Sequence, residues 1–403
     1  MKTEVTVIGL GYIGLPTAAL IASNNIKVLG VDINPLVVDT INKGEIHIIE
    51  PDLNEVVKKA VLQNYLFAAL KAIMSDVYII VVPTPFKERN EPDISFVEAA
   101  ITNIISLLKK DDLIIIESTS PVGTTSKMKN LIFKNRPDLE NQIYIAYCPE
   151  RVLPGNVLFE LVNNDRVIGG INEASTAKAI AFYRKFVSGE LHPTDDKTAE
   201  MCKLVENSSR DVQIAFANEL SFICDKAAIN VWELIKLANK HPRVSILQPG
   251  CGVGGHCIAV DPYFIVSDYP LESKIINKAR EINNYKSFWC AEKIKTTKFE
   301  YQLKHGKIPS IAFLGLAFKP NIDDLRESPA KFIVQKVLQD INNENNYIVE
   351  PNIVWHNIFK ITNLTEAIEK SDIIVFLVAH KEFQNITIPK EKITLDFCGI
   401  LNT

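Results

Sequence analysis

Three glycines close to the N-terminus constrain the fold of this chain more than any other feature. The run Gly9-Leu10-Gly11-Tyr12-Ile13-Gly14 follows the apolar segment Val5–Ile8 and opens a helical pattern. In such a strand–turn–helix unit the first glycine makes the turn, the second lets backbone approach a ligand, and the third permits close packing of helix on strand. The free N–H groups at the helix start favour a pyrophosphate. We therefore predict a dinucleotide site, with Gly9, Gly11, Tyr12, Ile13 and Gly14 at the cofactor.

An acidic residue ends the next predicted strand. Asp32 follows the strand-like run Lys27–Val31 and stands 18 residues after Gly14. A carboxylate in this place hydrogen-bonds the ribose diol of NAD, and its charge repels the 2′-phosphate of NADP. The expected cofactor is therefore NAD.

The first half of the chain alternates strand-like and helix-like segments. Apolar runs predict further strands at Val77–Val82, Leu113–Ile116 and Ile143–Tyr147, and the spacing predicts a helix at Ser95–Leu108. Continuous apolar strands between helices are typical of a parallel sheet that is covered on both faces. After about Asp195 the pattern changes to one long helix, followed by helices at Val231–Ala238 and from about Glu272 to Leu303.

Strand signals return near the C-terminus. Strands are expected at Ser310–Leu314, Ile373–Val378 and Ile393–Asp396, helices at Pro329–Gln339 and Leu364–Glu369, and a surface loop at 342–346. A chain of 403 residues exceeds the roughly 250–300 residues that one core supports. The predicted fold class is α/β, with two Rossmann-like doubly wound parallel-sheet domains, 1–195 and 305–403. A long central helix and a helical region, 196–304, join them.

Composition excludes several other classes of protein. The formal net charge is −4 and basic residues are scattered, so neither nucleic acid nor an anionic membrane is an expected partner. The seven cysteines are odd in number and widely spaced, which predicts neither a disulfide framework nor a metal site. Apolar runs are too short for a membrane span, and strand-like sequence from about Glu4 leaves no room for a signal peptide. We expect a reduced, cytoplasmic protein.

A cysteine lies in a glycine-rich segment far from the nucleotide site. Cys257 ends the run Gly252-Val253-Gly254-Gly255-His256-Cys257, and Asp261 follows four residues later. Most cysteines outside disulfides are buried small hydrophobes, and that reading applies to Cys257 taken alone. Beside a nicotinamide site, however, a thiolate can add to a carbonyl and hold it as a thiohemiacetal while a second hydride leaves. Asp261 is close enough to share the loop and polarise a water.

Other polar residues follow buried strands or share a helix face. Lys203 and Asn207 are four residues apart on the long helix and therefore share one face. They form either a solvated polar stripe or an oxyanion site, in which each donor typically stabilises the transition state by roughly 3–4 kcal/mol. Glu117–Gly123 and Cys148–Arg151 each follow a strand, and doubly wound sheets bind ligands beyond the carboxyl ends of strands. From its position alone, Glu150 is interpreted first as a charged residue on the surface.

With these residues in place, the chain resembles the UDP-sugar 6-dehydrogenase family over essentially its whole length. It looks most similar to the branch that acts on UDP-N-acetyl-D-mannosamine, through 44–53, 148–155 and 247–261. Val260 stands where the UDP-glucose branch commonly has lysine, which argues against UDP-glucose. The motifs that match the family are Val7–Pro16, Val82-Pro83-Thr84-Pro85, Glu117–Gly123, Pro149-Glu150, Lys203–Asn207, Gly254–Asp261, Phe318-Lys319-Pro320 and Arg326-Glu327-Ser328.

The resemblance implies a four-electron oxidation of the C6 alcohol of a UDP-sugar to a carboxylate by two NAD. Cys257 would carry the thiohemiacetal and thioester, and Lys203 and Asn207 would stabilise the oxyanions. Asp261 and Thr119 would hold water, while Glu150 would assist acid–base steps. The product would feed the synthesis of surface polysaccharide.

The resemblance also implies binding roles. Thr84, Thr119 and Arg326 would contact NAD. Residues that would bind substrate are Glu150, Arg151, Lys203, Asn207, Arg243, Gly254 and Lys319. Arg243 would reach the sugar site of a neighbouring subunit, and the long helix would form the core of a homodimer.

Three alternatives stay open from the sequence. The substrate can be UDP-N-acetyl-D-glucosamine or, less in keeping with Val260, UDP-glucose. The chain can be a two-electron hydroxy-acid dehydrogenase with a structural Cys257, or a non-catalytic sensor of nucleotide sugars. The yield of NADH separates the thiol mechanism, which gives two per sugar, from a two-electron dehydrogenase, which gives one, and from a sensor, which gives none.

Overall fold

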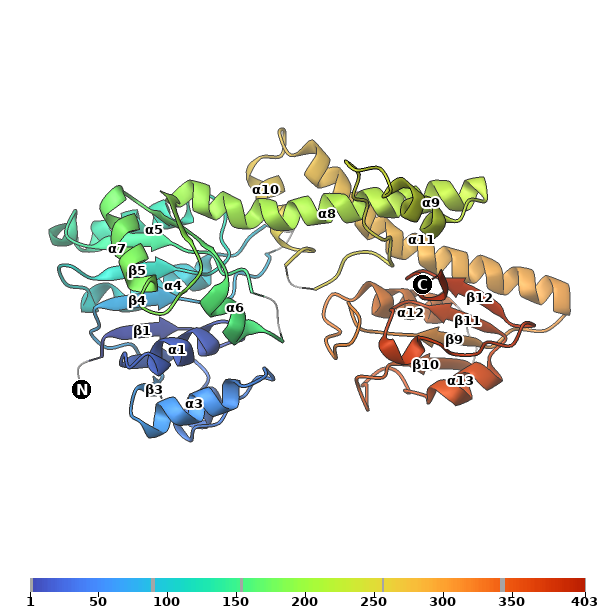
Figure 1. Cartoon of the computed structure of the whole chain (residues 1–403), viewed down its shortest axis with the longest axis horizontal. Coiled ribbons are helices and arrows are strands. Elements are labelled where there is room, and N and C mark those ends of the chain that lie inside the picture. The colour runs from blue at the N-terminus through green and yellow to red at the C-terminus, as the bar shows by residue number, and fades with distance from the viewer. Residues whose placement is uncertain (1–2, 88–90, 153–154, 256, 341–344, 403) are drawn as a thin grey trace. The chain divides into compact units, whose positions relative to one another are not determined.

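The computed structural model describes residues 3–87, 91–152, 155–255, 257–340 and 345–402. It divides into two compact units (Figure 1). The first unit comprises Met1–Glu206 and Tyr263–Asp268, and the second comprises Asn207–Pro262 and Tyr269–Thr403. The division into three domains at residues 195 and 304 stays a prediction.

The first unit is built on a sheet of eight described strands in the order β3-β2-β1-β4-β5-β6-β7-β8. Neighbouring strands are parallel, except that β6 and β7 pair antiparallel. The strand order reverses between β1 and β4, and ligands of doubly wound sheets bind at that switch point. The strands are β1 Val5–Ile8, β2 Val28–Val31, β3 Leu66–Ala69, β4 Val77–Ile80, β5 Leu113–Ile116, β6 Tyr144–Tyr147, β7 Arg166–Gly170 and β8 Leu191–Asp195.

Helices cover both faces of this sheet (Figure 1). Ile79 and Ile115 belong to the core on one face, whereas Ile80 and Ile114 belong to the core on the other, as the period of two along a strand requires. The helices are α1 Gly14–Ser23, α2 Pro35–Asn42, α3 Leu53–Leu62, α4 Ser95–Ile104, α5 Thr124–Asn135, α6 Val157–Asn163 and α7 Glu173–Tyr183, with short 3-10 turns η2 Ile105–Leu107 and η3 Pro137–Leu139. A further helix, α10 Asp261–Asp268, belongs to this unit from Tyr263 onward.

The long helix predicted after Asp195 is α8, Asp196–Ala227. It begins in the first unit and continues into the second, where α9 Val231–Ala238 and α11 Lys274–His305 follow it. Buried polar contacts join α8 to α11: Arg280 pairs with Asp211 at 2.7 Å, and Asn218 donates to Asn283 at 2.9 Å. Such satisfied buried groups fix the register of the two helices.

The second unit carries a parallel sheet of four described strands in the order β10-β9-β11-β12. Alternate residues of β9 and β11 face two apolar cores, so the second Rossmann-like sheet is confirmed. Of the surface loop expected at 342–346, residues 342–344 lie outside the described residues. The prediction is wrong for Asn346, which is the first residue of β10. The elements are β9 Ile311–Leu314, α12 Pro329–Asp340, β10 Asn346–Val349, α13 Leu364–Lys370, β11 Ile373–Phe376, η4 Lys381–Phe383, β12 Ile393–Asp396 and η5 Ile400–Asn402.

Candidate active site

The glycine turn after β1 has the shape that a dinucleotide requires. Gly9 has φ +94, and a Cβ there would lie 2.2 Å from the Val81 carbonyl oxygen. A Cβ on Gly14 would lie 1.8 Å from the Gly9 carbonyl oxygen, whereas a Cβ on Gly11 would meet nothing within 4 Å. The fold therefore needs Gly9 and Gly14, while the space beside Gly11 is open. That open space at a helix N-terminus fits the pyrophosphate of NAD.

Asp32 lies directly after β2 and is bonded to the glycine turn. Its Oδ2 accepts the Leu10 N–H at 3.0 Å, and its Oδ1 accepts the Asn34 N–H at 2.9 Å. Asp32 thus ties the turn to the neighbouring strand and places a carboxylate beside the predicted pyrophosphate position. This arrangement fits the ribose of NAD, as the sequence predicted.

Thr84 and Thr119 lie in the loops after β4 and β5. These strands are parallel neighbours, so both loops leave the same edge of the sheet. The Val82 N–H donates to the Ser118 hydroxyl at 2.9 Å and joins the two loops. The structure therefore places both threonines, half-buried, at the switch-point edge.

Glu150 and Arg151 follow β6, and neither is a loose surface charge. The Glu150 side chain is 9% exposed, and its Oε2 lies 3.0 Å from Arg166 Nη1. Its Oε1 accepts the Arg151 N–H at 2.6 Å. The Arg151 guanidinium pairs with Glu206 at 2.7 Å. The default reading of Glu150 as a surface charge is wrong, because a buried strand end and an arginine enclose it.

Asn207 and Asp261 are brought together in the second unit. Asn207 Nδ2 donates to Asp261 Oδ2 at 2.5 Å, and Asp261 is 3% exposed. The Asp261 N–H donates to the Cys257 carbonyl oxygen at 2.8 Å, so a single turn joins the two residues. Cys257 itself is exposed. Lys203 lies one helical turn before Asn207 on α8, in the first unit, and is half-buried.

The segment before Cys257 packs closely against the loops after β9. A Cβ on Gly254 would lie 2.4 Å from the Glu327 carbonyl oxygen, and a Cβ on Gly255 would lie 2.9 Å from the Phe318 ring. The glycines therefore allow this segment to contact the stretch that carries Lys319 and Arg326. His256 lies outside the described residues.

Lys319, Arg326 and Arg243 also lie in the second unit. Lys319 Nζ lies 6.0 Å from the centre of the Phe318 ring. Arg326 pairs with Asp324 at 2.7 Å, and Arg243 is exposed. The proposed contacts of these residues with ligands or a second subunit stay predictions.

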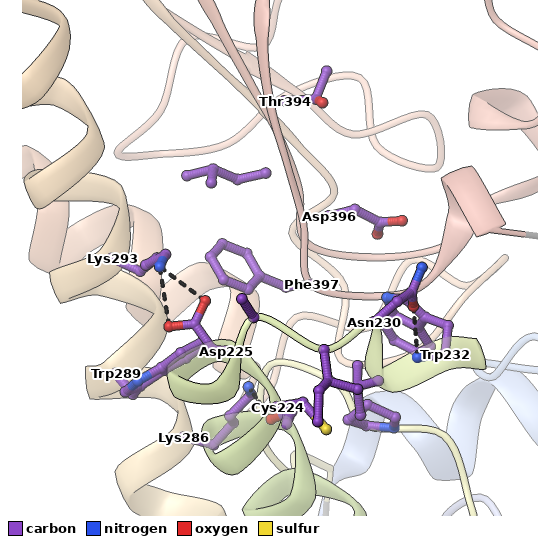
Figure 2. Close-up of a pocket in the computed structure, with 16 residues that line it drawn as sticks. Cys224, Asp225, Asn230, Trp232, Lys286, Trp289, Lys293, Thr394, Asp396 and Phe397 are labelled. Atoms are coloured by element: carbon purple, nitrogen blue, oxygen red, sulfur yellow. Dashed lines mark hydrogen bonds and ion pairs between the residues drawn. The ribbon is translucent and has the colours of Figure 1, made fainter. Parts of the chain in front are cut away.

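A separate cavity of about 450 Å³ lies in the second unit, and none of the predicted site residues lines it. Figure 2 shows Lys286 and Trp289 on its wall, with Lys293 paired to Asp225 at 2.8 Å. Lys286 donates to the Ser221 hydroxyl at 2.7 Å, and burial lowers its pKa. No local sequence pattern predicts this cavity, because its lining comes from α8, α9, α11 and the end of β12.

The described part of the chain shows neither a membrane-spanning helix nor a metal-binding cluster. Within the described ranges, no helix combines the length and apolar character needed to cross a bilayer. Across those same residues, no group of three or more His, Cys, Asp or Glu side chains is arranged to hold a metal ion.

Three stretches of the chain match one protein family. Residues 3–187 match the NAD binding domain of the UDP-glucose/GDP-mannose dehydrogenase family. Residues 197–285 match its central domain, and residues 312–403 match its UDP binding domain.

Individual proteins are similar over the whole chain. A UDP-N-acetyl-D-mannosamine dehydrogenase of Campylobacter jejuni is 53% identical over 412 residues, covering 98% of this chain and 99% of that protein. The protein of the same name from Escherichia coli (strain K12) is 52% identical over 400 residues, covering 95% and 94%. An NDP-N-acetyl-D-galactosaminuronic acid dehydrogenase of Ralstonia nicotianae is 50% identical over 394 residues, covering 95% and 92%.

Solved structures show the same extent of similarity. The structure of a UDP-D-ManNAc dehydrogenase from Pyrococcus horikoshii has a TM-score of 0.87 at 38% identity, and covers 99% of this chain and 96% of that chain. The similarity therefore includes both units and is not limited to the nucleotide-binding sheet.

Proposed function

Because this chain belongs to the UDP-glucose/GDP-mannose dehydrogenase family, we propose that it oxidises C6 of UDP-N-acetyl-D-mannosamine to a carboxylate. It is an NAD-dependent oxidoreductase that acts on a CH–OH group of a UDP-sugar, which confirms the expected cofactor and class. The choice of sugar rests on the names of the relatives and on Val260 beside Asp261. The NDP-N-acetyl-D-galactosaminuronic acid relative supports an N-acetylated hexosamine in general.

One observation carries the proposed chemistry. Cys257 is exposed at the end of a glycine segment, and its turn is held by Asp261, which in turn is bonded to Asn207. A thiol in that place can add to the C6 aldehyde formed by the first oxidation. Bound NAD supplies the hydride acceptor for each of the two oxidations.

The roles of the chain's own groups follow from their chemistry. The Cys257 thiolate forms a bond to C6 and holds the thiohemiacetal, whose oxygen accepts hydrogen bonds from Lys203 and Asn207. Loss of a second hydride leaves a thioester. Water attacks C6, the C–S bond breaks, and the thiolate returns. One water supplies the second carboxylate oxygen, and two NADH and three protons are released with each carboxylate.

Acid–base steps are assigned to the buried carboxylates. Asp261 and Thr119 hold water, and Glu150 accepts the proton from the water that attacks the thioester. Lys319, Arg151 and Gly254 bind the nucleotide sugar, and Thr84 and Arg326 contact NAD.

A homodimer is proposed from the long helix. Phe216 and Ile223 stand seven residues apart on α8, and they are 51% and 57% exposed. Leu237 on α9 is 62% exposed. Large apolar side chains that are exposed in this way are typical of a subunit interface, and Arg243 is proposed to reach a partner's site. Sedimentation of Phe216→Lys beside wild type tests the dimer, since a charge in the interface should give monomers. A cytoplasmic location stays a prediction.

The decisive experiment compares UDP-N-acetyl-D-mannosamine, UDP-N-acetyl-D-glucosamine and UDP-glucose side by side. We expect the first to give the highest kcat/KM and two NADH per sugar. Cys257→Ser should bind NAD but form no uronate, while the control Cys398→Ser should keep the wild-type yield. One NADH per sugar contradicts the thiol mechanism. Binding of UDP-sugar without NADH supports a sensor, and a faster reaction with either other sugar reassigns the substrate.

A further inference from the structure

The first unit buries two carboxyl groups around one arginine. Glu117 follows β5, Glu150 follows β6, and Arg166 begins β7. Arg166 Nη1 lies 3.0 Å from Glu150 Oε2 and 4.0 Å from Glu117 Oε1. Tyr183, the last residue of α7, donates its hydroxyl to Glu117 Oε1 at 2.6 Å.

The antiparallel pairing of β7 creates this cluster. Tyr147 lies opposite Gly169, and Ala146 lies opposite Gly170. When that register is continued beyond β6, Glu150 falls opposite Arg166. A parallel β7 would have placed the start of the strand, with its arginine, at the other edge of the sheet. The antiparallel direction of β7 therefore places Arg166 at the edge of the sheet where Glu150, the proposed acid–base residue, lies.

Because the cluster is buried, each charge in it needs a partner of opposite sign. The side chains of Glu117, Arg166 and Glu150 are 0%, 5% and 9% exposed. A buried charge is stable only when it is paired, and two carboxylates that share a site do not both ionise readily. One guanidinium compensates one carboxylate. Because Arg166 is closer to Glu150 than to Glu117, its charge compensates Glu150 first, and Glu117 retains its proton.

The other titratable neighbours stay neutral. Arg166 Nη1 lies 3.9 Å from the Cys148 thiol, and burial raises the pKa of Cys148 to about 12. Burial also raises the pKa of Tyr183 well above its usual value. For Glu117, burial together with the charge of Glu150 outweighs Arg166 and raises the pKa to about 7. Glu117 is thus the group of the cluster that titrates in the physiological range.

We propose that Glu117 and Arg166 are positioning residues that hold Glu150 as a carboxylate, Arg166 by pairing with it and Glu117 by keeping its own proton. This inference rests on the acid–base role proposed for Glu150. When Glu117 loses its proton, the guanidinium faces two carboxylates and compensates the charge of only one of them. The rate of thioester hydrolysis therefore depends on the charge of a residue that does not touch the substrate.

The first test is the pH profile of kcat. Glu117→Gln keeps the shape of the side chain and the acceptor for Tyr183, but it cannot ionise. We expect the wild-type profile to bend near pH 7, and the variant to lose that bend while keeping kcat within about 3-fold at lower pH. The control is Asp112→Asn, which alters a buried carboxyl at the opposite end of β5 and should leave the bend in place. A Glu117→Gln profile that superimposes on wild type overturns the proposal.

The second test does not depend on activity. At about pH 6, below the pKa of Glu117, the infrared difference spectrum of wild type minus Glu117→Gln should show the C=O stretch of a protonated carboxyl. In Glu150→Gln the single arginine pairs with Glu117 instead, so the band should disappear at the same pH. Absence of the band in wild type, or its persistence in Glu150→Gln, overturns the proposal.

The two tests separate this inference from the proposed function. If Glu150→Gln keeps the wild-type kcat, the acid–base role of Glu150 is wrong, whereas the infrared band still reports the proton on Glu117. Arg166→Lys retains a cation and should keep part of the activity. Arg166→Met should reduce the activity by roughly 10²-fold or more, because Glu150 then lacks the cation that is paired with it.

Discussion

Asn207 donates its side-chain amide to the carboxylate of Asp261, and the Asp261 backbone N–H in turn holds the carbonyl oxygen of Cys257. A side chain on α8 and the thiol-bearing turn therefore share one chain of hydrogen bonds. The proposed oxyanion donor and the turn of the proposed nucleophile are held by the same residue, Asp261, the first by its carboxylate and the second by its backbone N–H.

Removal of this amide should reduce the rate more than the binding of cofactor. Asn207→Ala deletes one of two oxyanion donors, so we expect kcat to fall by about 10²–10³-fold. The dissociation constant of NAD should stay within about 2-fold, because Asn207 lies outside the first unit. The measurement is steady-state NADH formation with a parallel NAD titration. Gln213→Ala, an exposed amide on the same helix, is the control. An unchanged kcat in Asn207→Ala would mean that the amide has only a structural role.

Two of the fingerprint glycines should respond differently to alanine. A Cβ on Gly14 would meet the Gly9 carbonyl oxygen at 1.8 Å, and backbone cannot yield to it cheaply. Gly14→Ala should therefore cost about 3 kcal/mol or more of folding free energy, at the upper end of overpacking.

A Cβ on Gly11 meets no protein atom within 4 Å, so Gly11→Ala should keep the wild-type Tm. It should nevertheless weaken NAD binding by roughly 10-fold, or about 1.4 kcal/mol, because the methyl group enters the pyrophosphate space. Thermal unfolding and NAD titration test both. Tight NAD binding by Gly11→Ala would contradict the placement of the pyrophosphate.

Cofactor choice should depend on the charge of Asp32. Asp32→Asn retains an oxygen acceptor for the turn but removes the repulsion of a 2′-phosphate. We expect kcat/KM for NAD to fall and kcat/KM for NADP to rise, so that the preference for NAD shrinks by roughly 10–100-fold. Asp39→Asn, an exposed carboxylate on the following helix, should leave the ratio unchanged. If Asp32→Asn keeps the wild-type ratio, another residue selects the cofactor.

Most of the strands that the sequence predicted are buried on both faces. The runs at β4, β5 and β11 are continuous apolar segments, and a run of this kind is typical of a covered parallel sheet. The strands β3, β7, β8 and β10 were not predicted. β8 is largely exposed, and its sequence Leu-His-Pro-Thr-Asp resembles a loop, whereas β3 is a run of only four apolar residues. The antiparallel direction of β7 follows from its connections, which no local pattern encodes.

Within the candidate site, the contacts that are local in sequence were predicted, and those between distant residues were not. The glycine turn and Asp32 are local in sequence, and their geometry was predicted from spacing. The contact of Asn207 with Asp261 joins residues 54 positions apart, so spacing could only suggest it. Arg166 was missed altogether, because an arginine at the start of a strand normally indicates surface, and here the side chain is 5% exposed.

Stability at low pH should depend on Glu350, which follows β10 and lies under the loop that carries Lys319. Glu350 Oε2 accepts the Leu316 N–H at 2.7 Å and faces His380 Nε2 at 3.1 Å, both side chains of that pair being fully buried. The Asn321 N–H donates to His380 Nδ1, which leaves Nε2–H to donate to the carboxylate. Burial alone would raise the pKa of Glu350, but the hydrogen bonds from His380 and Leu316 outweigh it and lower the pKa to about 2.

The sign of the effect follows from that direction. A carboxyl whose folded pKa lies below its ordinary value of 4.5 stabilises the fold above about pH 4.5, and this stabilisation is lost as the pH falls towards 2. The difference corresponds to about 3 kcal/mol. Glu350→Gln should therefore lower the free energy of unfolding at neutral pH and flatten its decline between about pH 4.5 and 2. Trp232, Trp289 and Trp355 all lie in the second unit, so urea unfolding followed by tryptophan fluorescence reports on this unit. Glu391→Gln, an exposed carboxylate of the same unit, should keep the wild-type decline. An equally steep decline in Glu350→Gln would show that other carboxylates control the acid stability.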